Sequence, residues 1–296
     1  MPSNTEMMHA QSQGIDLLPP NDIALILLRA QAEAAEAAIR SSDAICAAAA
    51  AMARTLSDGG KLYYIAAGSS GLMAAADAME LGGTFGIHPD QVQIVMAGGI
   101  PTSAQMPGGT EDDTAGLNEN LAPLSPLDTV IAVTASGGTR YTVAAAEIAR
   151  AKGASVIGIA NNPGSRLLDI ADIPVLLQTP PEVLSGSTRL GAGTAQKIAL
   201  NTLSTLMAVE LGHVYDGMMV NVVADNEKLM HRASGIVETI AGVGTTVAAD
   251  ALRQTGGLVK PAVLIASGAG SPEDANARLD RANGNLREAL AMLETR

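Results

Sequence analysis

The sequence predicts an α/β fold, a three-layer αβα sandwich with a central parallel sheet, extended by helices at both ends of the chain. Three observations predict it. Short apolar runs alternate with alanine-rich, helix-like runs between residues 61 and 177. Most of the apolar runs end in turns rich in Gly, Ser or Asn. Unbroken apolar runs of this kind are typical of strands buried on both faces, as in parallel sheets.

Composition narrows the possible functions. A formal net charge of −12 and 2% aromatic residues argue against a nucleic-acid surface, which needs basic stripes and stacking platforms. The single cysteine, Cys46, excludes an intrachain disulfide, and the four histidines show no metal-ligand spacing, so no metal is expected. The longest apolar block, residues 44–53, is about half the length of a membrane span, and no secretory signal is apparent. We therefore expect a cytoplasmic protein without a membrane partner.

The first predicted elements are helices. Residues 21–56 show helical spacing of apolar side chains, with Asn21 or Asp22 as a cap and a second helix start at residues 41–43. The sequence "SDGG" at residues 57–60 then ends the helix.

The middle of the chain alternates between strands and helices. We expect strands at residues 61–67, 91–97, 129–135 and 155–161, an edge strand at 173–177, and helices at 72–81, 117–124 and 140–153. Strands joined by helices in this way form parallel βαβ units.

The C-terminal part is predicted to be helical. Residues 189–211 and 225–242 favour two helices, and beyond residue 232 short helices alternate with Gly-rich turns. We accordingly divide the chain into an N-terminal helical segment (1–56), an α/β domain (57–230) and a C-terminal helical region (231–296).

Two strand-to-helix turns, at residues 63–71 and 130–139, look alike because each places serine beside glycine. In an open parallel sheet, ligands bind beyond the carboxyl ends of the strands, where N–H groups at a helix start favour an anion. Glycine and serine are also common in tight turns, so either turn alone fits a purely structural role equally well. Two such turns favour an anion site, and neither has the Walker or dinucleotide pattern of a nucleotide site.

These turns also carry a family resemblance. "AAGSSG" (66–71) and "TASGGT" (134–139) resemble the two phosphate loops of the sugar isomerase (SIS) domain. Residues 182–205 and 219–229 closely resemble the N-acetylmuramic acid 6-phosphate etherases and the related glucokinase regulatory proteins. The resemblance covers nearly the whole chain. It implies an SIS fold and a cofactor-independent lyase that acts on a sugar 6-phosphate as a homodimer.

The resemblance also implies a reaction. In the family, the lactyl ether at C3 is eliminated and water is added back, giving N-acetylglucosamine 6-phosphate and D-lactate. This chemistry needs a base for the C2 proton and an acid for the leaving oxygen. Glu80 and Glu111 match the two family glutamates, which implies Glu80 as the acid and Glu111 as the base, although the roles could be exchanged. Without the resemblance, each fits a solvated surface residue.

The same comparison implies the phosphate contacts. The expected phosphate-binding residues are Gly68, Ser69, Ser70, Thr134, Ser136, Gly137 and Thr139. Hydroxyl and backbone donors suffice for a phosphate that is held and never transferred, which explains the missing lysine. Arg140, Arg189 and Lys228 are possible further substrate contacts, and the last two fit structural ion pairs equally well.

The chain departs from the family pattern at motifs that face the ligand. Leu72 and Gly138 stand where the family has arginines, Leu81-Gly82-Gly83 replaces Cys-Pro-Pro, and Gly191 replaces a lysine. Arg140 restores a guanidinium two residues after Gly138. A guanidinium at this shifted position does not easily replace the family's arginine, because its geometry fixes which ligand oxygens it can contact. These changes predict a divergent member whose substrate could be altered.

Two other functions remain open from the sequence. One is an aldose-ketose phosphosugar isomerase, and the other is a non-catalytic phosphosugar sensor. Retention of both Glu80 and Glu111 favours an enzyme over a sensor. The long apolar helix at residues 190–211 adds to the expectation of a homodimer, since it looks too apolar for a lone subunit.

Overall fold

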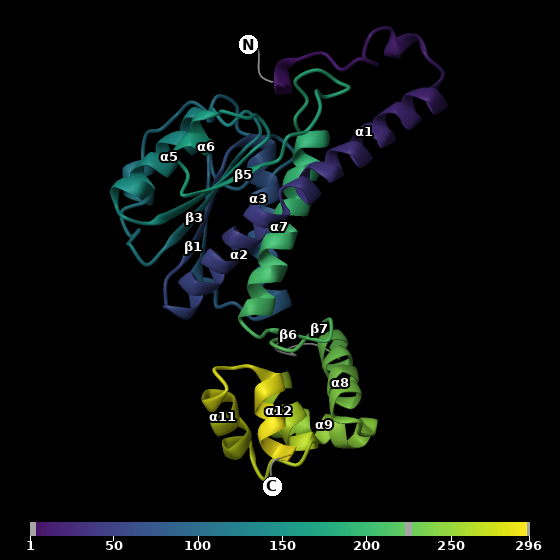
Figure 1. Ribbon diagram of the computed structural model, residues 1–296, viewed down its shortest axis with the longest axis vertical. Helices are drawn as coiled ribbons and strands as arrows, with labels where there is room; N and C mark the ends of the chain where they lie inside the picture. The colour runs from purple at the N-terminus through teal and green to yellow at the C-terminus, as the bar shows by residue number, and fades with distance from the viewer. Residues whose placement is uncertain (1–3, 223–226, 295–296) are drawn as a thin grey trace. The chain divides into compact units, whose positions relative to one another are not determined.

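The computed structural model describes residues 4–222 and 227–294 (Figure 1). The chain forms two compact units, and each is discontinuous in sequence. The first comprises Met1–Met79 and Pro89–Leu206, and the second comprises Glu80–His88 and Met207–Arg296. The three-part division at residues 57 and 231 stays a prediction.

The first unit contains a five-stranded sheet of order β2-β1-β3-β4-β5, in which every neighbouring pair is parallel. The strands are β1 (Leu62–Ala66), β2 (Val92–Met96), β3 (Thr129–Thr134), β4 (Ser155–Ala160) and β5 (Ile173–Leu176). The predicted fold class is confirmed, and β5 is an edge strand as expected. Ala66 pairs with Val133, so β1 and β3 end at the same edge of the sheet. The turns that follow these two strands therefore lie at that edge.

Helices cover both faces of this sheet (Figure 1). The helices that begin in this unit are α1 (Pro20–Arg40), α2 (Ser42–Ser57), α3 (Gly68–Phe85), α4 (Leu117–Asn120), α5 (Arg140–Ala151), α6 (Arg166–Ile170) and α7 (Gly191–Glu210), with short 3-10 turns at Asn4–Glu6, Ile15–Leu17 and Pro89–Gln91. Of these, α2 packs against β1, β3 and β5, and α5 and α6 pack against β4, whereas α1 extends away from the sheet. Alternate side chains of β1 point to opposite faces: Tyr63 and Ile65 join the core with Tyr141 of α5, whereas the hydroxyl of Tyr64 reaches α3.

The N-terminal helices agree with the sequence except at their cap. The expected break falls at Ser41, between α1 and α2. Helix α1, however, begins at Pro20, because proline has no N–H and loses nothing at the first helical position. Its buried residues are Ala34, Ala37 and Ala38.

The second unit is mostly helical, as the sequence predicts. Its elements are β6 (Val214–Tyr215), β7 (Met218–Met219), α8 (Glu227–Ala241), α9 (Thr245–Gln254), α10 (Val259–Ala266), α11 (Pro272–Arg281) and α12 (Leu286–Glu294), together with the last residues of α3 and α7. Val237, Leu252 and Val263 lie at the centre of its apolar core. The small β6–β7 hairpin was not expected from the sequence.

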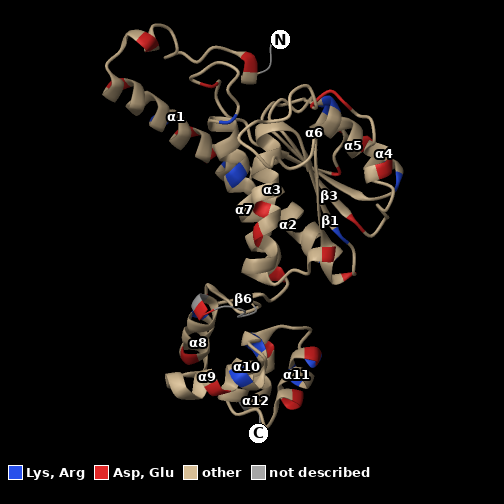
Figure 2. Cartoon of the chain, turned by 180° about the vertical axis from the view of Figure 1, so that it is seen from behind, with Lys and Arg blue, Asp and Glu red and all other residues tan. Residues whose placement is uncertain are grey.

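Among the described residues, no single helix is long and apolar enough to cross a membrane. One bent pair, Leu229–Ala241 with Thr245–Gln254, passes the test of length and composition. Charged residues are spread along the helices of both units, and Lys and Arg appear singly rather than as a basic stripe in the described part of the chain (Figure 2).

Candidate active site

Three hydroxyls gather in the second turn, where β3 ends and α5 begins. Thr134 Oγ1 lies 2.6 Å from Thr139 Oγ1 and 3.3 Å from Ser136 Oγ, which is 3.4 Å from Thr139 Oγ1. The backbone N–H of Gly138 donates to Ser136 Oγ (3.1 Å). Thr134 is buried and Ser136 is exposed, so the cluster reaches from the sheet edge to solvent. The structure thus brings together the three hydroxyls that the sequence singled out in this turn.

Glycine is required at position 137. Its φ is +71°, and a Cβ there would overlap the side chain of Ser165. Its carbonyl accepts a hydrogen bond from the N–H of Leu167 (2.9 Å) at the start of α6. The neighbouring turn after β4 therefore supports this second turn from outside.

The first turn differs from the expected open loop. Helix α3 begins at Gly68, so Ser69 and Ser70 lie in its first turn. The φ of Gly68 is +55°, and this left-handed backbone takes the chain from β1 straight into the helix. Ser70 is buried, whereas Ser69 is half-buried. Both serines remain at the N-terminal end of a helix, where N–H groups favour an anion.

Glu111 connects the two turns. Its carboxylate lies against Gly68, because a Cβ built on that glycine would be 3.4 Å from Glu111 Cδ and nearer still to Oε1. Its own carbonyl accepts the N–H of Tyr141 (3.0 Å) in the first turn of α5. The irregular segment at residues 98–116 thus carries one predicted catalytic carboxylate to the edge of the sheet where both hydroxyl-bearing turns lie.

Glu80 lies on α3, twelve residues along the helix from Gly68, and its side chain is exposed. At 1.5 Å per residue this is about 18 Å, so a single chain does not bring Glu80 to the turns that Glu111 connects. One helical turn earlier, Asp77 is buried and accepts hydrogen bonds from Tyr64 Oη (3.0 Å), Asn201 Nδ2 (2.7 Å) and Ser204 Oγ (2.9 Å). Burial raises the pKa of the Asp77 carboxyl, and the three hydrogen bonds oppose that rise. This network fixes α3 against β1 and α7, and the sequence analysis did not identify it.

The predicted basic contacts lie at exposed positions. Arg140 is the first residue of α5, and Arg189 lies in the turn before α7. Leu72, which replaces a family arginine, is 38% exposed on the second turn of α3. The side chain of Lys228 lies outside the described residues.

Gly191, which replaces a family lysine, begins α7 against a buried carboxylate. Glu182 is 4% exposed and accepts hydrogen bonds from the N–H groups of Gly191 (2.9 Å) and Ala192 (2.8 Å). A Cβ at position 191 would lie 3.1 Å from Glu182 Oε2 and 3.3 Å from Ala34 Cβ, so glycine fits this close approach. Glu182 therefore caps α7. The sequence analysis placed Glu182 at the start of the family-like segment 182–205 but did not predict this capping role.

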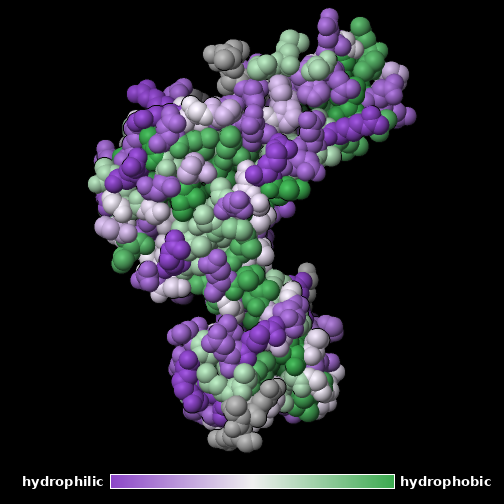
Figure 3. All heavy atoms as spheres, in the orientation of Figure 1, coloured by the Kyte–Doolittle hydropathy of each residue, from purple (hydrophilic) through white to green (hydrophobic). Residues whose placement is uncertain are grey.

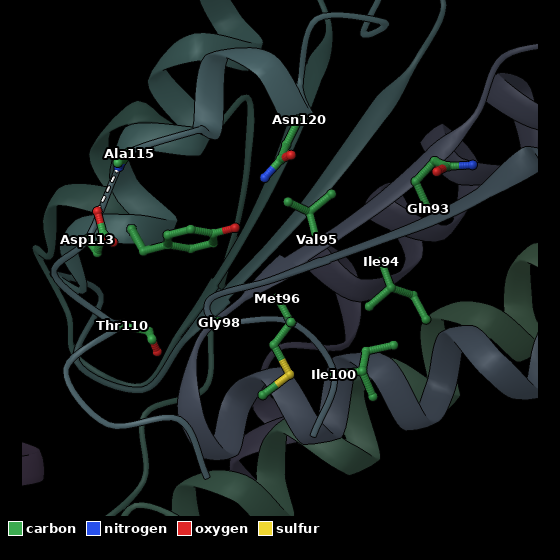
Figure 4. A pocket seen from close by; sticks show the side chains of 12 residues that line it. Gln93, Ile94, Val95, Met96, Gly98, Ile100, Thr110, Asp113, Ala115 and Asn120 are labelled. Atoms are coloured by element: carbon green, nitrogen blue, oxygen red, sulfur yellow. Dashed lines mark hydrogen bonds between the residues drawn. The ribbon is translucent and has the colours of Figure 1, made fainter. Parts of the chain in front are cut away.

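A pocket of about 540 Å³ lies along the outer edge of β2 and includes Gln93, Met96, Thr110 and Tyr141 in its lining (Figure 4). Thr110 precedes Glu111, and Asp113 accepts the N–H of Ala115 (2.9 Å) at the border of the same pocket. Among the described residues, no group of three or more His, Cys, Asp or Glu is placed to hold a metal ion.

Comparison with known proteins gives the family. The SIS domain matches residues 28–161. A protein of Deinococcus radiodurans named N-acetylmuramic acid 6-phosphate etherase is 42% identical over 292 residues, 98% of this chain and 95% of that protein. A Rubrobacter xylanophilus protein of the same name is 40% identical over 288 residues, 97% of this chain and 95% of that protein. The chain belongs to the N-acetylmuramic acid 6-phosphate etherase family.

Solved structures of other proteins share the fold of this chain's first unit. A protein described as a phosphosugar isomerase involved in capsule formation, from Bacteroides fragilis, superimposes with a TM-score of 0.53 at 20% identity, covering 67% of this chain and 95% of that one. A protein described as a sugar-phosphate isomerase from Listeria monocytogenes superimposes with a TM-score of 0.50 at 16% identity, covering 65% of this chain and 92% of that one. At these identities, the likeness shows the fold alone.

Proposed function

We propose that the chain cleaves the D-lactyl ether of N-acetylmuramic acid 6-phosphate, giving N-acetylglucosamine 6-phosphate and D-lactate. Relatives that bear the etherase name are 40–42% identical over nearly the full length of this chain. This similarity supports an etherase over an isomerase or a sensor. Exposed Cys46 supports the further proposal that the protein works in a reducing cytoplasm.

The phosphate is held at the carboxyl edge of the sheet. Thr134, Ser136 and Thr139 offer hydroxyls from one turn, and Ser69 and Ser70 offer hydroxyl and backbone donors from the other. These groups bind the phosphate oxygens and take no part in the reaction. The phosphate stays bound and unaltered while it orients the sugar.

Two carboxyl groups carry out the elimination. The family resemblance implies that Glu111 takes the proton from C2 of the open-chain sugar and that Glu80 protonates the lactate oxygen as the C3–O bond breaks. Water then adds to the resulting double bond. The Glu80 carboxylate takes a proton from water as the hydroxyl adds to C3, and protonated Glu111 returns its proton to C2, so both carboxyl groups regain their starting states. The resemblance supports this order of roles, which could be exchanged between the two residues.

The observation that carries the proposal is the position of Glu111. Its carboxylate touches the first turn at Gly68, and its carbonyl is bonded to the start of α5, which follows the second turn. A carboxylate between two turns that hold a phosphate is placed to act on the same sugar.

The test is release of D-lactate from N-acetylmuramic acid 6-phosphate by the pure protein. Glu111→Gln and Glu80→Gln should each lower kcat by about 10²–10⁴-fold, the range for loss of a general acid or base. Glu119→Gln, at an exposed glutamate of α4, is the matched control and should retain full activity. Absence of lactate with the unaltered protein would reject the etherase function, and full activity in both variants would reject the assigned roles.

We also propose a homodimer, but on a different surface from the one that the sequence suggested. Residues Ala195, Leu200 and Leu203 of α7 are at most 1% exposed within a single chain, so this helix needs no second copy to cover them. Helix α1 instead exposes Leu25 (50%), Leu28 (66%) and Ile39 (65%), and apolar residues are visible on this part of the surface (Figure 3). An exposed apolar helix favours association.

Light scattering checks this proposal. A dimer that Leu25→Glu/Leu28→Glu converts to monomer would support the α1 surface. A monomer at all concentrations of the unaltered protein would reject it.

A further inference from the structure

The N-terminal segment reaches the back of the second turn. Thr5, in the 3-10 turn Asn4–Glu6, and Asn162, in the turn after β4, are 3% and 4% exposed. The Nδ2 group of Asn162 donates to Thr5 Oγ1 (3.0 Å) and to the carbonyl of Ser136 (3.2 Å). The N–H of Thr5 donates to Asn162 Oδ1 (3.4 Å). One amide thus joins the start of the chain to the hydroxyl-bearing turn.

The partners of this amide fix its orientation. The N–H of Thr5 can only donate, so it requires the oxygen of the Asn162 amide on its side. The carbonyl of Ser136 can only accept, so it requires the nitrogen. The N–H of Thr5 therefore sets the orientation of the amide that supports Ser136. The Thr5 hydroxyl accepts from the same Nδ2 group that donates to Ser136, so its loss would leave that buried nitrogen with one partner fewer.

Ser136 is held from both sides. Its hydroxyl accepts the N–H of Gly138 and lies in the cluster with Thr134 and Thr139, while its carbonyl points the other way, to Asn162. A buried amide left without partners costs more free energy than one such hydrogen bond contributes. Loss of the support from Asn162 would allow the turn to relax away from the geometry that its hydroxyls need.

We propose that Thr5 and Asn162 are positioning residues for the ligand, and that the segment Asn4–Glu6 is a structural part of the second turn. The inference rests on the proposed function of that turn in holding the sugar phosphate. Thr5 touches no substrate atom in this proposal. It acts through Asn162 on Ser136, and its effect falls on binding more than on the chemical step.

Thr5→Val tests the proposal, because valine keeps the shape of threonine and removes only the hydroxyl. The KM for N-acetylmuramic acid 6-phosphate and the inhibition constant for inorganic phosphate should both rise by about 3–10-fold, and kcat should stay within about twofold, as expected for loss of one hydrogen bond that supports binding. Thr5→Ser should restore both constants. Asn162→Ala should raise them at least as much as Thr5→Val.

Ser12→Ala is the matched control. Ser12 belongs to the same N-terminal segment, and its hydroxyl donates to the carbonyl of Val183 (2.7 Å), away from the second turn. This variant should leave KM and the phosphate constant unchanged. An equal rise in Ser12→Ala and Thr5→Val would overturn the proposal, as would unchanged constants in Thr5→Val.

Amide hydrogen exchange separates this inference from the proposed function. Without any ligand, residues 136–140 should exchange faster in Thr5→Val than in the unaltered protein, and α7 should exchange at the same rate in both. Unchanged exchange at residues 136–140 overturns the positioning role, whatever the enzyme's activity. Absence of lactate from the unaltered protein overturns the proposed function alone, because faster exchange would still establish the link through Asn162.

Discussion

The carboxylate of Glu111 lies directly against Gly68, the residue at which β1 passes into α3. The two residues are far apart in the sequence, and their approach depends on the absence of a side chain at position 68. The φ of +55° at Gly68 adds a second reason for glycine, since other residues rarely adopt it. The first turn and the candidate base are therefore built as one site.

Gly68→Ala should abolish most lactate release, because the new methyl group displaces the Glu111 carboxylate. The strained backbone should also lower the free energy of unfolding by about 1–2 kcal/mol. Gly59→Ala is the control for strain: its φ is +81°, and a Cβ there meets nothing within 4 Å. Thermal melting should show similar losses in both variants, while the lactate assay separates them. Retained activity in Gly68→Ala would contradict the placement of Glu111.

Thr142→Val should stabilise the protein. Thr142 of α5 is 0% exposed, and its hydroxyl has no hydrogen-bond partner among the described residues. Removing an unsatisfied buried hydroxyl should raise the free energy of unfolding by about 1 kcal/mol. The matched change is Thr55→Val in α2, where Thr55 Oγ1 lies 2.6 Å from Thr129 Oγ1 and its loss should cost about 1 kcal/mol. Urea unfolding measures both, and effects of the same sign would contradict this account.

The buried network at Asp77 should be costly to break. Tyr64→Phe and Ser204→Ala each remove one hydrogen bond to the carboxylate and should lower the free energy of unfolding by about 1–2 kcal/mol. Because both bonds end on the two oxygens of one carboxylate, the double variant should depart from the sum of the single effects. Strict additivity in urea unfolding would show that the two bonds act independently.

His213 should make the protein sensitive to mild acid. Burial and, secondarily, the nearby Lys260 lower its pKa from 6.5 to about 4. Between these values the unfolded chain binds the proton and the folded chain does not. Stability is therefore fully present above pH 6.5 and falls progressively as the pH drops toward 4.

His213→Gln should reduce this loss, as measured by melting temperatures at pH 7.5 and about pH 4.5. His231→Gln, at an exposed histidine of α8, provides the comparison. An equal acid shift in the unaltered protein and in His213→Gln would contradict the assignment to His213.

Local sequence patterns predicted the sheet and most helices, because the apolar runs of β1, β3 and β4 need no distant information to be recognised. Helix α6 was missed, since five residues give too little periodicity. The predicted loop at residues 68–71 proved to be the first turn of α3, because Gly68 allows the chain to turn without a separate loop.

The residues of the candidate site also differ in whether local sequence patterns can predict that they lie together. Thr134, Ser136 and Thr139 are near neighbours in sequence, so one turn brings their hydroxyls together as predicted. Glu111 follows an irregular segment, and only the family resemblance singled it out. The pair Thr5–Asn162 spans 157 residues, a separation that no local pattern can bridge. Two consecutive asparagines directly after a buried strand were the one signal available.

The discontinuous second unit limits how this protein can be recombined with its relatives. Residues Phe85 and Ile87 are buried in that unit, and the Phe85 carbonyl accepts a hydrogen bond from Asn221 (3.0 Å). A chimera joined at residue 206 would import a foreign C-terminal part while keeping the native segment Glu80–His88. Because Glu80 lies in that segment, exchange of the whole second unit requires three crossovers, at residues 79/80, 88/89 and 206/207, and the candidate acid is inherited with the C-terminal part.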